Sequence, residues 1–194
     1  MAILKANGKI LKANGKILGK QEGSGDTVVI GNRAYPYKRF GNLFWLTENL
    51  KENVGTNLPP GGDSANIETY GRLYKLSSMM SLPDKHPTNS FAALIPSGWR
   101  IPTAQDCADL FASVGGESVA YRELAKEEYG FNLTYPGYYD ESLYSGKDSS
   151  FYFAMTGDIP SYFYQTYTLY KYRTFYQSFL GSKYISLRLV KSAT

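Results

Sequence analysis

The residues best suited to molecular recognition lie in the last quarter of the chain, where tyrosine is concentrated. Between Phe151 and Tyr184, eight tyrosines and five phenylalanines occur in 34 residues, with only four charged side chains. Tyrosine offers a large, rigid stacking surface and a hydroxyl that both donates and accepts, at a small cost in side-chain entropy. This composition predicts a surface that binds a ligand through aromatic contacts.

Nine aromatic residues of this segment are the candidate ligand-binding residues. Aromatic residues also favour strands for packing reasons alone, so some of these rings could be ordinary core, and strand alternation predicts that about half of the in-strand members face inward. Residues 161–172 nevertheless hold more rings than the two faces of a strand in a small domain can easily bury, so some are expected to meet solvent or a partner. The candidates are Tyr152, Tyr162, Phe163, Tyr164, Tyr167, Tyr170, Tyr172, Tyr176 and Phe179.

Residue types for catalysis or metal binding are scarce. The single histidine, His86, lies in a polar segment bracketed by prolines and is expected in an exposed loop. The single cysteine, Cys107, lies on the apolar stripe of a predicted helix, where a buried and inert thiol is expected. One cysteine and one histidine cannot supply a typical zinc site, and no phosphate loop, dinucleotide fingerprint or nucleophile elbow is present. We therefore expect no enzymatic activity, no metal site and no cofactor.

Carboxylates leave one enzymatic alternative open. A pair of them facing one another across a cleft could act as acid and base, as in glycoside hydrolysis, and sequence alone does not show whether any two do so. The residues concerned are Glu48, Asp106, Asp109 and Glu117.

The composition limits the classes of protein to which the chain can belong. Its 194 residues, 43% of them hydrophobic, suffice for one full core with an appended segment. The net charge of +4 arises from five lysines within residues 1–20, where there is no acid, so the remainder is close to neutral. We therefore expect no nucleic-acid partner. No apolar run approaches the length of a membrane span or has the pattern of a secretory signal, so neither membrane insertion nor an export signal is expected.

The N-terminus carries a heptapeptide repeat, in which Ile-Leu-Lys-Ala-Asn-Gly-Lys occupies residues 3–9 and again 10–16. Each unit contains Asn-Gly, which breaks helices and favours hairpin turns, so short strands are predicted rather than a coiled coil. One unit cannot bury its Ile-Leu pair, which predicts a homo-oligomer or larger assembly through this arm; a frayed terminus is the alternative. We divide the chain into a repeat arm with its linker, residues 1–26, and a ligand-binding domain, residues 27–194.

Strands and loops come first in the domain. Short apolar runs predict strands at residues 27–30 and 43–46. Residues 51–66 are rich in Gly, Pro, Asn and Asp, which predicts a long surface loop. From Tyr129 onward the chain again has the pattern of short strands and loops.

Two helices are predicted between these regions. Helical spacing of apolar residues predicts one over residues 70–80, ended by Pro83. The second begins at the N-cap Thr103 with Asp106 as its capping-box partner. Its apolar stripe and its end at Gly115-Gly116 are equally clear, and together the elements predict an α+β domain with two helices and short mixed or antiparallel strands. The stripe consists of Cys107, Leu110, Phe111 and Val114.

Four motifs, taken in order, resemble one known family. The motifs are Trp45-Leu-Thr-Glu-Asn-Leu50, Tyr70-Gly-Arg-Leu-Tyr74, Pro96-Ser-Gly-Trp-Arg-Ile-Pro-Thr103 and Tyr184-Ile-Ser-Leu-Arg-Leu-Val-Lys191. Their order and spacing resemble the Fibrobacter succinogenes major paralogous domain, a group of bacterial surface and phage-borne proteins with the C-type-lectin-like fold, and the similarity covers about residues 27–191.

These motifs have the character of a scaffold. Gly98 and Pro102 bracket a corner that leads into the second helix, and residues 184–190 are expected to alternate as a closing strand. The calcium-dependent sugar-binding branch of the C-type lectins is marked by Glu-Pro-Asn or Gln-Pro-Asp and Trp-Asn-Asp triplets, which are absent here. Formylglycine-generating enzymes of this fold need a cysteine pair, and this chain has one cysteine. The expected core residues are Trp45, Trp99, Leu187 and Val190.

The fold also hosts the variable proteins of diversity-generating retroelements, in which adenines are mutated in the last segment before a fixed C-terminus. Residues 150–182 match that segment in position and in residue types, which are reachable from Asn codons. The resemblance implies a receptor-binding protein of a phage tail fibre or virion that binds a bacterial surface protein or glycan. The alternative is a fixed bacterial adhesin or structural module of the same fold, located at the cell surface.

Overall fold

The structure is a computed structural model that describes residues 5–6, 9–10, 26–81, 86–148, 150–154, 164–170, 173–179 and 182–193. The predicted linker spans residues 21–26, of which residues 21–25 lie outside the described residues, as does Pro83, the expected end of the first helix. Side chains at residues 5–6, 9–10, 150, 152–154, 164–168, 170 and 173–179 also lie outside the description, although their backbone is within it.

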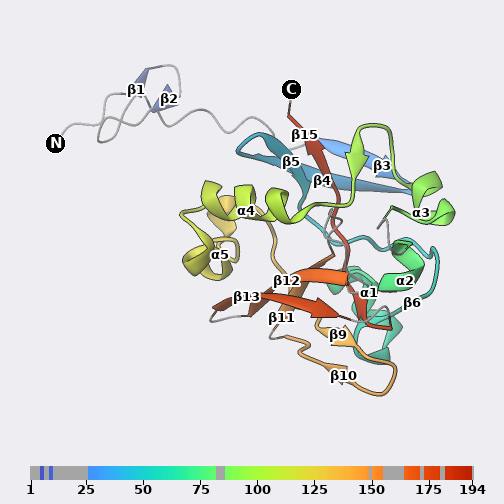
Figure 1. Cartoon of the computed structure of the whole chain (residues 1–194). Helices are drawn as coiled ribbons and strands as arrows, with labels where there is room; N and C mark the ends of the chain where they lie inside the picture. Colours follow the sequence, from blue (N-terminus) through green and yellow to red (C-terminus); the bar gives the residue numbers. More distant parts are fainter. Residues whose placement is uncertain are drawn as a thin grey trace.

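The first large sheet joins the start of the domain to its C-terminal end (Figure 1). The predicted strands at residues 27–30 and 43–46 are confirmed as β3 and β5. The strand between them was not predicted, because Pro36 and three basic residues interrupt its apolar pattern. The order is β3 (Thr27–Ile30), β4 (Arg33–Phe40), β5 (Leu43–Leu46), β15 (Val190–Ser192) and β8 (Trp99–Arg100), with every neighbouring pair antiparallel.

Two further sheets complete the β structure of the domain, and their paired strands are also antiparallel. One has the order β10 (Tyr144–Ser145), β9 (Tyr138–Tyr139), β14 (Tyr184–Ile185), β7 (Leu73–Lys75) and β6 (Asn57–Leu58). The other has the order β11 (Ser150–Ala154), β12 (Tyr164–Tyr170) and β13 (Arg173–Phe179).

Helix α4 (Ala104–Ser113) confirms the predicted capped helix. The Thr103 hydroxyl accepts from the Asp106 backbone N–H, and the Asp106 carboxylate accepts from the Thr103 N–H, so both halves of the capping box are formed. A second helix, α5 (Glu117–Glu123), follows Gly115-Gly116 and was not predicted. Its apolar residues are too few to give a clear periodic signal over seven positions.

The predicted helix over residues 70–80 is wrong. That region contains the end of α1 (Ile67–Tyr70), strand β7 and the one-turn helix α2 (Leu76–Met79). Gly71 ends α1 with φ 76° and ψ −165°, a conformation that only glycine adopts readily. The residues that follow pair with β6 and β14, so tertiary pairing overrides the local helical spacing.

The predicted number of two helices is also wrong, since the described residues contain five α-helices. The one not yet mentioned is α3 (Asn89–Leu94). The predicted loop at residues 51–66 is mostly irregular but includes β6 and two short 3-10 helices, η1 (Pro60–Gly62) and η2 (Ser64–Asn66). A third 3-10 helix, η3 (Glu127–Tyr129), precedes the segment that leads to β9. The α+β class is confirmed, with curled antiparallel sheets and few helices.

The closing segment differs from its prediction. Residues 184–190 are buried without exception, so the expected alternation of inward and outward residues is absent. Strand β14 ends at Ile185, and the next residues run beside the end of β5 and the chain that follows it: Leu46 N donates to Leu189 O (3.1 Å) and Leu50 N to Leu187 O (2.9 Å). The predicted core residues Trp45, Trp99, Leu187 and Val190 are all buried, as expected.

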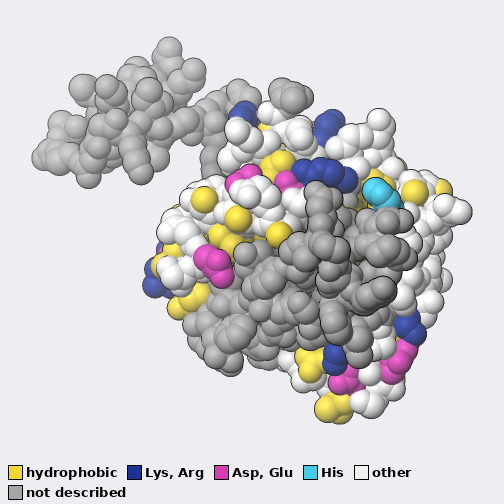
Figure 2. All heavy atoms as spheres, in the orientation of Figure 1, with side chains coloured by type: hydrophobic (Ala, Val, Ile, Leu, Met, Phe, Trp, Pro, Cys, Tyr) yellow, Lys and Arg dark blue, Asp and Glu magenta, His cyan; other side chains and the backbone are white. Residues whose placement is uncertain are grey.

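The repeat arm forms the two short strands β1 (Lys5–Ala6) and β2 (Lys9–Ile10), which pair antiparallel. Their pairing confirms the expectation of short strands for this part of the repeat; its role in assembly stays a prediction. Among the described helices, none is long and apolar enough to cross a membrane. Basic and acidic side chains are interspersed over the described part of the face shown in Figure 2.

Candidate functional site

The aromatic segment forms a three-stranded antiparallel sheet, β11–β12–β13, hereafter the aromatic sheet. Of the nine candidate residues, six lie in its strands. The register pairs Tyr167 with Tyr176 and Tyr164 with Phe179, while Tyr152 is opposite Thr168 and Tyr170 is opposite Arg173. The structure thus brings the backbones of these six residues into one sheet. The remaining three, Tyr162, Phe163 and Tyr172, lie outside the described residues.

Two residues attach the aromatic sheet to the rest of the domain. Phe151 of β11 and Leu169 of β12 are direct cross-strand partners, and both are fully buried. They belong to the same core cluster as Leu110 and Phe111 of α4 and Ala120 of α5. Figure 1 shows α4 and α5 above this sheet, and α5 contacts both β12 and β13. One face of the sheet is therefore committed to the core.

A group of tyrosines on the second sheet lies next to the aromatic sheet, since β14 contacts β11. The rings of Tyr139 and Tyr144 lie 4.5 Å apart between centroids, and Tyr184 packs edge-on against Tyr139 at 5.4 Å. Lys183 places its Nζ 4.8 Å from the centroid of Tyr138. Tyr138, Tyr139 and Tyr144 are only half-buried, so aromatic side chains outside the segment selected from the sequence are also partly exposed.

Arg188, which follows β14, is the polar centre of the domain. It is 2% exposed, and its guanidinium donates to Asn49 Oδ1 (2.7 Å) and to the carbonyl oxygens of Phe131 (2.5 Å) and Asn132 (2.9 Å). Its Cζ lies 4.4 Å from the ring centroid of Phe131 and 5.2 Å from that of Phe151. The same cation thus links the segment after β5, the segment before β9 and the first strand of the aromatic sheet.

The surroundings of Arg188 are neutral in their direct contacts. Burial lowers the pKa of Arg188 to about 9, and the negative charge of Glu48 opposes that shift. The guanidinium therefore stays protonated at neutral pH. It is hydrogen-bonded to neutral oxygen acceptors, and among the residues that the structure describes no carboxylate forms an ion pair with it.

A polar pocket opens beside Arg188. Its volume is about 170 Å³, and four separate segments contribute to its wall: the chain after β5, helix α1, the chain before β9 and the chain after β14. Asn49 is held at its floor, because its Nδ2 donates to Tyr70 O (2.8 Å) and to Thr134 Oγ1 (3.2 Å). The lining residues are Glu48, Asn49, Lys51, Glu68, Thr69, Asn132, Thr134 and Arg188.

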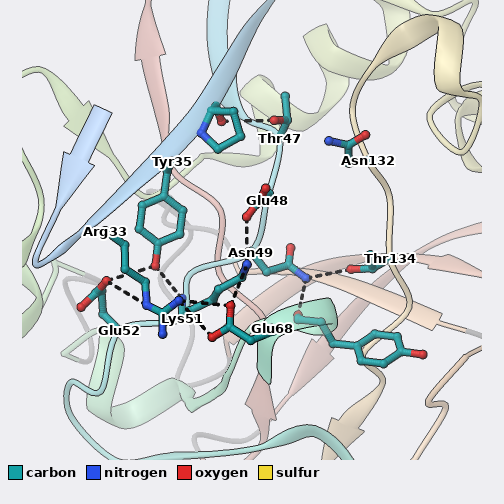
Figure 3. A network of polar contacts seen from close by, with 12 residues as sticks. Arg33, Tyr35, Thr47, Glu48, Asn49, Lys51, Glu52, Glu68, Asn132 and Thr134 are labelled. Atoms are coloured by element: carbon teal, nitrogen blue, oxygen red, sulfur yellow. Dashed lines mark hydrogen bonds and ion pairs between the residues drawn. The ribbon is translucent and has the colours of Figure 1, made fainter. Parts of the chain in front are cut away.

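The rim of the pocket is an ion-pair network (Figure 3). Lys51 Nζ lies 3.0 Å from Glu48 Oε2 and 3.7 Å from Glu68 Oε2, and Arg33 Nη1 lies 3.0 Å from Glu68 Oε1. Behind it, the Tyr35 hydroxyl donates to Glu52 Oε1 (3.2 Å) and accepts from the Lys51 backbone N–H (2.9 Å).

Burial and the nearby Glu52 charge raise the pKa of Tyr35, although its hydrogen bond from the Lys51 N–H opposes the shift. Tyr35 therefore acts as a neutral hydrogen-bonding group that fixes the backbone of Lys51. Because Tyr35 of β4 belongs to the buried hydrophobic core, this hydrogen bond attaches the rim of the pocket to that core.

The single histidine and the single cysteine lie in the surroundings that the sequence predicted. His86 is exposed, and Cys107 is fully buried, where desolvation and the Asp106 charge raise the pKa of its thiol. Within the described ranges, no three His, Cys, Asp or Glu side chains lie close enough to hold a metal ion.

Two of the four candidate carboxylates bind side chains close to them in the sequence. Asp106 completes the cap of α4 and binds Arg100, and Asp109 accepts from Gln105 (2.8 Å). Glu48 alone of those four residues lines the pocket.

Sequence reasoning missed the pocket, although the sequence contains two signals for it. Glu48 and Asn49 come soon after the apolar run that ends at Leu46, separated from it by Thr47, and Arg188 places a charge between Leu187 and Leu189 of the closing segment. A polar side chain inside a buried run needs partners, and such partners converge on a polar site. The sequence does not show that these positions come together in space.

Comparison with known proteins adds no relative: neither a family model, nor a curated protein, nor a solved structure matches this chain.

Proposed function

We propose that this chain is a non-enzymatic ligand-binding protein that displays the aromatic sheet on a C-type-lectin-like scaffold. Its ligand would be a protein or glycan on a bacterial surface, and the protein would act on a phage tail fibre or virion as a diversified receptor-binding subunit. One observation carries the proposal: a tyrosine-rich sheet is attached to the core along one face by Phe151 and Leu169.

The register of the aromatic sheet supports different roles for its two faces, one packing against the core and the other contacting the ligand. Successive residues of a strand belong to opposite faces, so positions two apart share a face. Positions 167 and 176 fall on the face of Leu169, and positions 152, 164, 170 and 179 fall on the opposite face. We expect the second set to provide the ligand contacts and the first set to support the core. This narrows the candidate contacts within the strands from six to Tyr152, Tyr164, Tyr170 and Phe179.

The scaffold assignment draws support from the closure of the domain. Strand β15, next to the C-terminus, lies between β5 and β8 in the sheet that also contains β3, so the two ends of the domain meet in one sheet. Three residues of the motifs that carry the resemblance lie in the strands of this sheet and are buried: Trp45, Trp99 and Val190. Substitutions in the aromatic sheet could therefore leave this closure intact.

Population sequencing of the gene, with its flanking DNA, tests the proposal. Diversification predicts substitutions concentrated at adenine-derived codons between residues 150 and 182, with an unmutated near-copy of that stretch nearby. Codons for Phe151, Leu169, Trp99 and Arg188 should stay constant, because these residues are buried. An unvarying segment without a near-copy would contradict diversification and favour the fixed adhesin instead.

A further inference from the structure

We infer that the polar pocket beside Arg188 is a second binding site, for a single neutral sugar residue held without a metal ion. The site is separate from the aromatic sheet and does not rest on the function proposed for that sheet. Three properties of the pocket carry the inference: its size, its balance of charge and its unused hydrogen-bonding capacity.

The size and lining of the pocket exclude an apolar ligand. All eight lining residues are polar or charged, so burying hydrocarbon there would desolvate polar groups without replacing their partners. With about 170 Å³ the pocket is smaller than the roughly 300–1,000 Å³ typical of drug-sized ligands. A small polar molecule, such as one sugar ring, is the class that remains.

The charges of the pocket favour a neutral molecule. Lys51 and Arg188 contribute two positive charges, and Glu48 and Glu68 contribute two negative charges. Lys51 lies between both carboxylates, so an anion would meet repulsion at the rim and a cation would compete with Lys51. A hydroxyl-rich neutral ligand meets neither obstacle.

The hydrogen-bonding groups left available include both donors and an acceptor. Glu48 engages Lys51 through Oε2, which leaves Oε1 free to accept from a ligand, and Lys51 has a third N–H beyond its two carboxylate partners. Thr134 Oγ1 accepts from Asn49 Nδ2, which leaves its own O–H to donate. Adjacent sugar hydroxyls each donate and accept, so they match such a mixed set.

The floor is preorganised for such a ligand. Asn49 is 3% exposed and has its amide oxygen and both amide hydrogens engaged by Arg188, Tyr70 and Thr134. A floor that is already fixed loses little conformational freedom when a ligand binds. We expect weak binding by one sugar residue, with a Kd in the millimolar range, because few contacts are available in so small a site.

The test is an NMR titration of the full chain with methyl glycosides of glucose, galactose, mannose and N-acetylglucosamine, in the presence of EDTA. At least one glycoside should shift the amide resonances of Asn49 and Thr134 saturably. Glu48→Ala should weaken that binding about tenfold, because it removes a charged acceptor. The matched control is Glu128→Ala on η3, a 71% exposed carboxylate that also pairs with a lysine, and it should leave binding unchanged.

The inference would be overturned if no glycoside shifts those amides at millimolar concentration, or if Glu48→Ala and Glu128→Ala bind equally. A second rim variant, Glu68→Ala, checks that weaker binding in Glu48→Ala does not come from a local structural change. Glu68 is 65% exposed, so its removal should not affect folding. Tyr170→Ala in the aromatic sheet should leave glycoside binding intact. A loss in that variant would place the sugar on the aromatic sheet and contradict the separate site.

Discussion

Arg188 Nε donates a 2.7 Å hydrogen bond to Asn49 Oδ1, joining two buried residues that are 139 positions apart. Asn49 in turn binds the carbonyl oxygen of Tyr70 and the hydroxyl of Thr134, so one polar pair connects the segments that enclose the pocket. Arg188 also contacts the ring of Phe151, the first anchor of the aromatic sheet. The pair therefore stabilises the scaffold beneath both proposed binding sites.

Removing the Arg188 side chain should destabilise the domain strongly. In Arg188→Ala the carbonyls of Phe131 and Asn132 and the amide oxygen of Asn49 lose their donor inside the protein, and we expect a loss of about 3–5 kcal/mol in the free energy of unfolding. Urea denaturation measures it. Arg39→Ala, at an exposed arginine of β4, should change stability by less than about 0.5 kcal/mol. Equal effects of the two variants would refute the structural role of Arg188.

A methyl group at Gly71 should disrupt the floor of the pocket. A Cβ there would lie 2.6 Å from Asn49 Cβ and 2.8 Å from Leu50 O, in addition to the strain of φ 76°. We expect Gly71→Ala to cost at least about 3 kcal/mol. Gly41→Ala is the matched control: its φ is also positive, 59°, but the nearest atom, Ser113 Cβ, is 4.0 Å away, so strain alone should cost about 1 kcal/mol. The difference between the two unfolding free energies then measures the clash together with the additional strain of the Gly71 conformation, φ 76° and ψ −165°.

The Asp106 carboxylate should make the stability of the domain depend on pH. Burial opposes its ionisation, but hydrogen bonds from Arg100 and Thr103 outweigh burial and hold the pKa of Asp106 below its ordinary value of 3.8. Since the folded pKa is the lower one, the stabilisation is present above pH 3.8 and is lost as pH falls through the folded pKa. Wild type and Asp106→Asn should therefore converge in unfolding free energy on acidification. Urea denaturation at neutral and acidic pH measures this difference, and a difference of the same size at both pH values would contradict the prediction.

The two faces of the aromatic sheet should differ in chemical accessibility. Tyrosine nitration followed by mass spectrometry should modify Tyr164 and Tyr170 in the folded protein and spare Tyr167 and Tyr176, whose positions share the face of Leu169. Nitration of all four at similar rates would show that the sheet is not anchored along one face. The same alternation predicts that Tyr167→Ser lowers the thermal midpoint more than Tyr170→Ser does.

The sequence by itself determined the parts of this protein whose causes are local. The cap of α4 was predictable because Thr103 and Asp106 satisfy the backbone of their own first turn, and the buried stripe through Cys107 follows from helical spacing. Strands β3 and β5 were predictable from short apolar runs. The concentration of tyrosines likewise marked β11–β13 as a candidate binding surface.

Tertiary structure alone decided the rest, because its causes lie far apart along the chain. The region after Tyr70 becomes strand β7 because β14, more than a hundred residues later, pairs with it. Arg188 is buried rather than outward-facing because its acceptors come from Asn49, Phe131 and Asn132, which no local pattern connects to it. The polar pocket exists only where these segments meet, since a buried charge is stable only when distant parts of the chain supply its hydrogen bonds together.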